Sequence, residues 1–200
     1  MHSPTQPLLI VISGPSGAGK DSVIRALKKR GLPIHFVVTA TSRPKRPNEV
    51  EGVDYLFVSR ARFEEMIANN ELIEHAVVYG EYKGVPRQQV MDALASGKDV
   101  ILRVDVQGAL TLRRQFPDAV LIFLSAEDLD EIAKRLESRS TEEEEELRRR
   151  LDTAQWEMDH LCEFDYWVVN RRGKLNQTAD ILIAIIQAEH HRTCRQRSVP

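Results

Sequence analysis

The sequence predicts an α/β fold in which a parallel β-sheet is flanked by helices. Short runs of apolar residues alternate with segments whose apolar residues recur at helical spacing. A run that is apolar throughout is typical of a strand buried on both faces, and strands separated by helices favour parallel pairing. The expected strands cover residues 8–13, 36–41, 99–105, 119–124 and 166–170.

The first expected strand leads through a glycine-rich turn into the first expected helix. This helix carries Val23, Ile24 and Leu27 at helical spacing, and Gly31 is a stop signal at its end. A strand, a glycine turn and a helix in this order form the opening of a βα unit. Further helices are expected over residues 127–137 and 179–189.

Residues 39–92 interrupt the alternation of strands and helices. A basic loop broken by prolines covers residues 42–47, and the segment from Tyr55 to about Val90 mixes strand and helix patterns. We therefore expect a subdomain inserted into the sheet-forming core.

Composition indicates one globular domain and excludes several classes of partner. A chain of 200 residues can bury a core of its own, and its net charge of -2 gives no general attraction to nucleic acid or membranes. Residues 8–13 are too few to span a bilayer. Cys162 and Cys194 lack metal-ligand spacing, so free thiols in a reducing cytoplasm are expected. Residues 191–200 have the composition of a frayed polar tail.

A phosphate-binding loop follows the first strand. Its glycines let successive backbone N–H groups point at an anion, the helix that follows adds its positive dipole end, and a lysine supplies a full charge. This spacing between a strand and a helix predicts a P-loop NTPase core that binds the phosphates of ATP. The loop residues are Gly14, Pro15, Ser16, Gly17, Ala18, Gly19 and Lys20.

The residue after the loop lysine differs from the usual pattern. Ser or Thr commonly holds Mg²⁺ at this position, whereas this chain has Asp21 followed by Ser22. Both side chains offer hard oxygen ligands. Asp105 ends an apolar strand, where P-loop proteins place an acid near the metal, although a helix cap or turn residue would look the same. The expected Mg²⁺ ligands are Asp21 or Ser22, together with Asp105.

Four further segments resemble the guanylate kinase family. They are Thr41–Pro47 followed by Gly52–Tyr55, then Leu72–Ala76, Val104–Gly108, and Arg135–Glu142 with Arg150. The resemblance covers about residues 8–190. It implies transfer of the γ-phosphate of ATP to GMP, with Mg²⁺, in a domain with a GMP-binding insertion and a lid. On this basis the core is 1–38, 93–134 and 151–200, the GMP-binding insertion is 39–92, and the lid is 135–150.

The resemblance also implies roles for individual residues at the GMP site. Glu74 would accept hydrogen bonds from N1–H and the 2-amino group of guanine, a donor pair that adenine lacks. Thr39 would donate to guanine O6. The GMP phosphate would be bound by Arg43, Arg46 and Tyr55, with Lys83 and Asp105 completing the site.

On the ATP side, the same resemblance implies that a lid closes over the reacting phosphates. Its residues are Arg135, Arg139 and Arg150, which act with Lys20 and Arg43 as the catalytic set, and Asn170 lies near the adenine. An oxygen of the GMP phosphate is already deprotonated near neutral pH, so the reaction needs positioning and charge neutralisation rather than a general base. A solvated helix with Glu–Arg pairs is compatible with the lid role.

Three residues depart from the common family pattern. Lys83 replaces a tyrosine, Val85 replaces a hydroxyl side chain, and Arg103 stands where an aspartate is usual. Together with Asp21, these departures resemble the guanylate kinase variants of plant organelles. With no transit peptide at the start of the sequence, the expectation is a bacterial-type cytoplasmic enzyme.

Three other functions are compared with this interpretation. The Lys20-Asp21-Ser22 segment also resembles the ribose bisphosphokinases of phosphonate metabolism, but such an enzyme would not need Glu74 and Thr39 to recognise guanine. A non-catalytic guanylate-kinase-like scaffold module typically loses the phosphate loop, which is intact here. A nucleic-acid binder is disfavoured by the charge balance and by the lack of basic and aromatic residues in alternation.

Overall fold

A computed structural model describes residues 6–47, 49–78, 80–137 and 144–193. The elements are β1 Leu9–Ser13, α1 Lys20–Lys29, β2 Ile34–Phe36, β3 Ala40–Thr41, β4 Leu56–Phe57, α2 Arg60–Ala68, β5 Leu72–Val78, β6 Glu81–Pro86, α3 Arg87–Ala95, β7 Asp99–Arg103, α4 Val106–Gln115, β8 Val120–Ser125, α5 Leu129–Glu137, α6 Glu144–Asp159, the short 3-10 helix Leu161–Glu163, β9 Tyr166–Val169 and α7 Leu175–His190.

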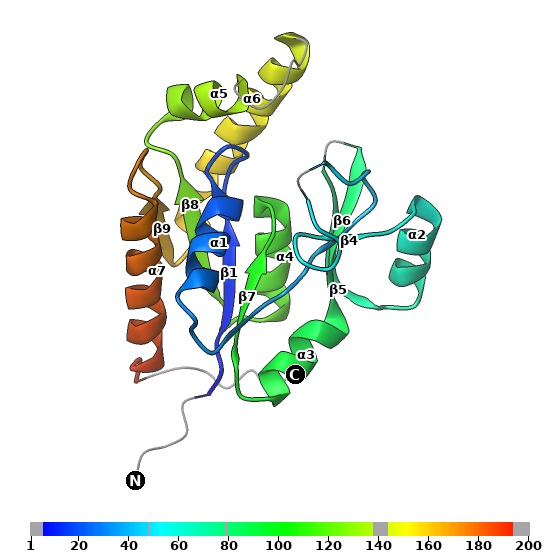
Figure 1. Ribbon diagram of the computed structural model, residues 1–200, viewed down its shortest axis with the longest axis vertical. Coiled ribbons are helices and arrows are strands. Elements are labelled where there is room, and N and C mark those ends of the chain that lie inside the picture. Colours follow the sequence, from blue (N-terminus) through cyan, green and yellow to red (C-terminus); the bar gives the residue numbers. More distant parts are fainter. Residues whose placement is uncertain (1–5, 48, 79, 138–143, 194–200) are drawn as a thin grey trace.

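The core of the protein is a five-stranded sheet in the order β2-β7-β1-β8-β9, and all of its pairings are parallel. Figure 1 shows helices on both of its faces. This arrangement confirms the predicted α/β class. Because all strands run in one direction, their carboxyl ends lie along a single edge, where α/β proteins bind ligands.

Alternate residues of β1 belong to two separate hydrophobic clusters. Ile10 and Ile12 pack on one face with residues of α1 and α7, including Leu27. Leu9 and Val11 pack on the other face with residues of α3 and α4. The continuous apolar run therefore has a simple physical reason, since neither face of this strand meets water.

The insertion forms a second sheet with a core of its own. Its strand order is β4-β3-β6-β5, and it packs with α2 around the buried side chains Ala40, Phe63, Met66 and Leu72. Figure 1 shows this unit beside the main sheet.

The prediction of one strand over residues 36–41 is wrong. β2 ends at Phe36, and Ala40 and Thr41 belong to the second sheet, where they pair with Gly84 and Lys83 of β6. The apolar run is continuous because β2 is partly buried and β3 is buried, and periodicity alone cannot show that the chain changes sheets.

Other boundaries also differ from the expectation. β7 ends at Arg103 instead of residue 105, because Asp105 caps α4, a helix that the sequence analysis did not identify. The last helix begins at Leu175, four residues before the predicted start at residue 179. Shifts of this size are common where a helix begins or a strand ends.

α5 and α6 make up the region around the predicted lid. They pack against each other through Ile132, Leu151 and Ala154, close to Ala126 at the end of β8. Figure 1 shows both helices beyond the carboxyl ends of β1 and β8. Within the described ranges, no helix is both long and apolar enough to cross a membrane.

Candidate active site

The phosphate loop depends on two glycines for its backbone path. Gly14 has φ 128°, and a Cβ at this position would lie 2.0 Å from the carbonyl oxygen of Leu124. Gly19, which precedes α1, has φ 89° in the left-handed region. Only glycine takes both conformations without strain, so the loop can curl between β1 and α1.

The ammonium group of Lys20 folds back over this loop. It donates to the carbonyl oxygens of Gly14 and Pro15, the latter at 3.0 Å. Burial lowers the pKa of Lys20, while the carboxylates of Glu157, Asp21 and Asp105 oppose that shift. The loop therefore holds a cation at the end of β1, where phosphate groups bind in P-loop proteins.

Asn170 supports the loop from inside the protein. Its side chain is buried, its Nδ2 donates to the carbonyl oxygen of Ala18 at 2.9 Å, and its Oδ1 accepts from the hydroxyl of Thr178 at 3.2 Å. The structure thus gives this residue a bracing contact. Its predicted position near the adenine stays a prediction.

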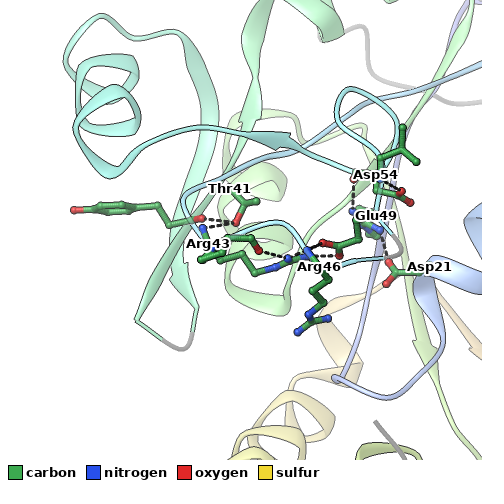
Figure 2. A network of polar contacts seen from close by, with 10 residues as sticks. Asp21, Thr41, Arg43, Arg46, Glu49 and Asp54 are labelled. Carbon is green, nitrogen blue, oxygen red and sulfur yellow. Dashed lines mark hydrogen bonds and ion pairs between the residues drawn. The ribbon is translucent and has the colours of Figure 1, made fainter. Parts of the chain in front are cut away.

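Arg43 is the centre of a charged cluster in the insertion. Its guanidinium binds both carboxylate oxygens of Glu49, and it lies 4.8 Å from the ring centroid of Tyr55 and 5.5 Å from that of Phe57. Hydrogen bonding to Glu49 is the main cause that raises the pKa of Arg43. Figure 2 shows this pair with Thr41 and Arg46. The fork of Arg43 already binds a planar anion here.

Arg46 contributes to the same cluster through its backbone. Its N–H donates to Glu49 Oε2 at 2.9 Å, whereas its side chain is exposed. Figure 2 shows the Arg46 guanidinium pointing away from Glu49. A second cation therefore stands beside the anion-binding fork without being committed to this carboxylate.

Glu74 is buried, in contrast to the exposed acid that an ordinary surface strand would carry. It has an exposed fraction of 6%, and burial, with the negative charge of Asp105, raises its pKa to about 8. A buried carboxyl group with a strongly raised pKa is typical of a functional position. Thr39 is also buried, and its hydroxyl donates to the carbonyl oxygen of Arg103 at 3.4 Å.

Asp105 connects the phosphate loop electrostatically with the insertion. Its Oδ1 accepts from Gly108 N–H at 2.8 Å, so it does cap α4. Its charge also acts on Lys20, Glu74 and Lys83. Burial lowers the pKa of Lys83 to about 8, and Lys20 adds to that shift. Charged groups from both parts of the protein therefore converge around Asp105.

Glu157 of α6 is a residue that the sequence analysis missed. It has an exposed fraction of 6%, it lies near Lys20, and burial raises its pKa to about 7. The backbone N–H groups of Ser16 and Val106 oppose this shift. A detectable pattern existed, because Leu151, Ala154 and Glu157 share the helical spacing of a buried face.

Two of the expected metal ligands, Asp21 and Ser22, make polar contacts with arginines. Asp21 forms an ion pair with Arg103, and the hydroxyl of Ser22 accepts from Arg25 at 3.4 Å. The described residues contain no group of three His, Cys, Asp or Glu side chains that could hold a metal ion.

Of the three predicted lid arginines, only Arg150 has a side chain within the described part of the structure. Arg150 is partly buried on α6. Arg135 belongs to α5, although its side chain is outside the described part of the structure, and Arg139 lies entirely outside the described residues. Their approach to ATP stays a prediction.

The parallel sheet and the phosphate loop together define the class of P-loop kinases. A family model described as guanylate kinase matches residues 6–189. The chain belongs to the guanylate kinase family.

Individual relatives agree with this assignment. The chain is 50% identical over 195 residues to Guanylate kinase 2, chloroplastic/mitochondrial, of Oryza sativa subsp. japonica, covering 95% of this chain and 68% of the relative. It is 45% identical over 183 residues to the guanylate kinase of Halalkalibacterium halodurans, covering 92% and 89%. The crystal structure of guanylate kinase from Anaplasma phagocytophilum matches with a TM-score of 0.80 at 32% identity, covering 97% of this chain and 92% of that one.

Proposed function

We propose that this protein transfers the γ-phosphate of ATP to the phosphate of GMP, giving ADP and GDP. The observation that carries the proposal is the buried carboxyl group of Glu74, which lies in the insertion and feels the charge of Asp105. Glu74 would be the hydrogen-bond acceptor that selects guanine, and the phosphate loop of the same chain would bind ATP. Family membership supports the same reaction.

The insertion, residues 39–92, is the proposed GMP-binding unit. Arg43, Arg46 and Tyr55 would bind the GMP phosphate, with Glu49 as the anion that now occupies the Arg43 fork. Lys83 and Asp105 would complete the phosphate side of the site, and Glu74 and Thr39 the base side. Guanidinium groups suit a dianionic phosphate because they donate two parallel hydrogen bonds.

The phosphate loop and Lys20 are the proposed ATP site, and residues 135–150 are the proposed lid. Arg135, Arg139 and Arg150 would neutralise charge on the phosphoryl group in transit, with Asn170 near the adenine. Because polar groups fixed before the reaction stabilise developing charge without reorganisation, positioning is the main task of these residues. Closure of the lid and of the insertion would also exclude water.

Mg²⁺ is the proposed metal. Nucleotide-bound Mg²⁺ takes most of its ligands from phosphates and water, so a protein site with few carboxylates fits it. Ser22 and Asp105 are the favoured protein ligands, since Asp21 is paired with Arg103. When bound, the metal would neutralise charge on the phosphates of ATP.

We place the enzyme in the cytoplasm, which is reducing. Cys162 is exposed and free, as expected for a thiol in such a compartment. Cell fractionation with an antibody against the chain tests this placement, and recovery in an organelle fraction would contradict it.

The test of the reaction is ADP production from MgATP with GMP, dGMP, AMP, UMP and ribose 1,5-bisphosphate in separate assays. Turnover with GMP and little turnover with AMP supports the proposal. The matched variant Glu74→Gln has the same shape and no negative charge, so it should lose GMP turnover and keep ATP binding. Turnover with the ribose phosphate alone would keep the kinase and change its acceptor, and absence of turnover with tight peptide binding would favour a scaffold module.

A further inference from the structure

Arg103, at the end of β7, contacts both the phosphate loop side of the protein and the insertion. Its Nη1 forms an ion pair with Asp21, the residue after the loop lysine. Its Nη2 donates to the carbonyl oxygen of Asp54 at 3.1 Å, and its guanidinium carbon lies 4.5 Å from the ring centroid of Tyr55. Figure 2 shows Asp21 and Asp54 within this one network of contacts.

The ring of Tyr55 is shared by two guanidinium groups. Arg43 lies 4.8 Å from its centroid and Arg103 lies 4.5 Å from it. Arg43 is the residue whose fork binds the Glu49 carboxylate. Any displacement of Arg103 therefore acts on Tyr55, and through Tyr55 on the proposed acceptor-phosphate cluster of Arg43, Arg46 and Tyr55.

An ion pair with a residue of the core holds the largely buried side chain of Arg103. Its exposed fraction is 15%, and its partner Asp21 belongs to the first turn of α1. A planar guanidinium binds a carboxylate with one nitrogen and a carbonyl oxygen with another while its face contacts a ring, in a fixed geometry that the flexible point charge of a lysine does not hold. Within the described residues, Arg103 thus contacts Asp21, Asp54 and Tyr55 at the same time.

We propose that Arg103 is a positioning residue, which fixes the acceptor-phosphate cluster relative to the phosphate loop through its ion pair with Asp21. The proposal rests on the proposed function. Phosphoryl transfer requires the attacking oxygen to face the γ-phosphate in line, and a misplacement of about 1 Å can cost about 100-fold in rate. Arg103 controls that alignment because it contacts both sides of the reaction at once.

When Arg103 is changed, ATP and GMP should therefore still bind at their sites, but phosphoryl transfer between them should be slow. In Arg103→Met, kcat with GMP should fall about 10- to 100-fold. The dissociation constants of ATP and of GMP, each measured alone by calorimetry, should stay within about 3-fold of the wild-type values. Arg103→Lys should not restore kcat, because it keeps the charge and loses the fork.

A double-mutant cycle tests the role of Asp21. Asp21→Asn should reproduce the kcat loss of Arg103→Met, and the double variant should lose little more, since both changes break the same pair. The matched control is Arg113→Met, which removes an ion pair with Asp165 at the far end of α4. Its kcat should equal that of the wild type, and its melting temperature reports the cost of losing a comparable ion pair.

Three results would overturn the proposal. They are wild-type kcat in Arg103→Met, wild-type kcat in Arg103→Lys, and loss of GMP affinity with kcat unchanged, which would make Arg103 an ordinary acceptor ligand. Failure of the proposed function is distinguishable from these results, because the wild-type chain itself would then not phosphorylate GMP.

Discussion

The carboxyl group of Glu74 occupies the space that a side chain at position 108 would fill. A Cβ built on Gly108 would lie 2.7 Å from Glu74 Oε1 and 2.8 Å from its Cδ. Gly108 belongs to α4, where a glycine costs about 1 kcal/mol relative to alanine. The helix therefore carries a locally unfavourable residue at the point where it meets the buried acid.

The first prediction concerns this contact. Gly108→Ala should push the Glu74 carboxyl group out of place and lower kcat/KM for GMP by about 10-fold or more, because a buried polar contact is lost. Stability should stay within about 1 kcal/mol of the wild type, since alanine favours the helix. Steady-state kinetics with the KM for ATP as internal control, and urea unfolding, measure both. An unchanged KM for GMP would show that Glu74 adapts without cost.

The second prediction concerns stability as a function of pH. Folding raises the pKa of Glu74 from 4.5 to about 8, so its contribution is fully present below pH 4.5 and is lost as pH rises through 8. The free energy of unfolding should fall by up to about 1.4 kcal/mol per pH unit for this group in that window. Urea unfolding from pH 5 to 9 measures it, and Glu74→Gln should flatten the curve.

Glu157 provides a control for that experiment. Its pKa is raised from 4.5 to about 7, so its stabilising contribution is fully present below pH 4.5 and should be lost as pH rises to about 7, before the Glu74 contribution is lost. The fall between pH 7 and 8 should consequently disappear in Glu74→Gln and persist in Glu157→Gln. If the free energy of unfolding depended on pH in the same way in both variants, the two acids would not have different pKa values in the folded protein.

The third prediction concerns protons released when GMP binds. Near pH 7 the Glu74 carboxyl group is mostly protonated, whereas an ionised carboxylate accepts better from the guanine N–H groups. GMP binding should therefore release close to one proton at pH 7 and fewer at pH 9. Calorimetry in two buffers of different ionisation enthalpy measures this release. It should be absent in Glu74→Gln, and equal release by that variant would point to another group.

The fourth prediction concerns the fork of Arg43. Arg43→Lys keeps the charge but loses the bidentate contact that Arg43 makes with Glu49, so KM for GMP should rise about 10- to 100-fold. Arg60→Lys is the matched control, because Arg60 also stacks on a tyrosine, Tyr82, at 4.8 Å but is exposed on α2. Equal KM values for the two variants would remove Arg43 from the acceptor site.

Sequence patterns predicted the parts of the fold that depend on local chemistry. Strands β1 and β8 were recognisable because both of their faces are buried. The phosphate loop was recognisable because its backbone path requires glycines at fixed positions, which leave a sequence pattern. The change of sheet after Phe36 was not predictable, since pairing partners lie far along the chain. Helix α4 was hidden because its polar residues, such as Gln107, weaken the apolar periodicity.

The candidate site follows the same division. Lys20 belongs to a compact motif and could be proposed from spacing alone, whereas Arg43 could be proposed only from the resemblance to a family. The burial of Glu74 depends on α4, which comes from elsewhere in the chain, so no local pattern contains it, whereas Glu157 shares the helical spacing of Leu151 and Ala154. Nor could the sequence show that two departures from the family pattern, Asp21 and Arg103, are partners in one ion pair.

That ion pair has a consequence for how this lineage can change. Replacing Asp21 alone would leave Arg103, which is largely buried, without this ion-pair partner near Lys20 and Lys83, whereas replacing Arg103 alone would leave the Asp21 carboxylate, which is 45% exposed, beside Lys20. Loss of Asp21 before Arg103 should therefore destabilise the protein more than loss of Arg103 before Asp21. Among homologous chains the two positions should therefore have changed together, as a linked pair with a shared history.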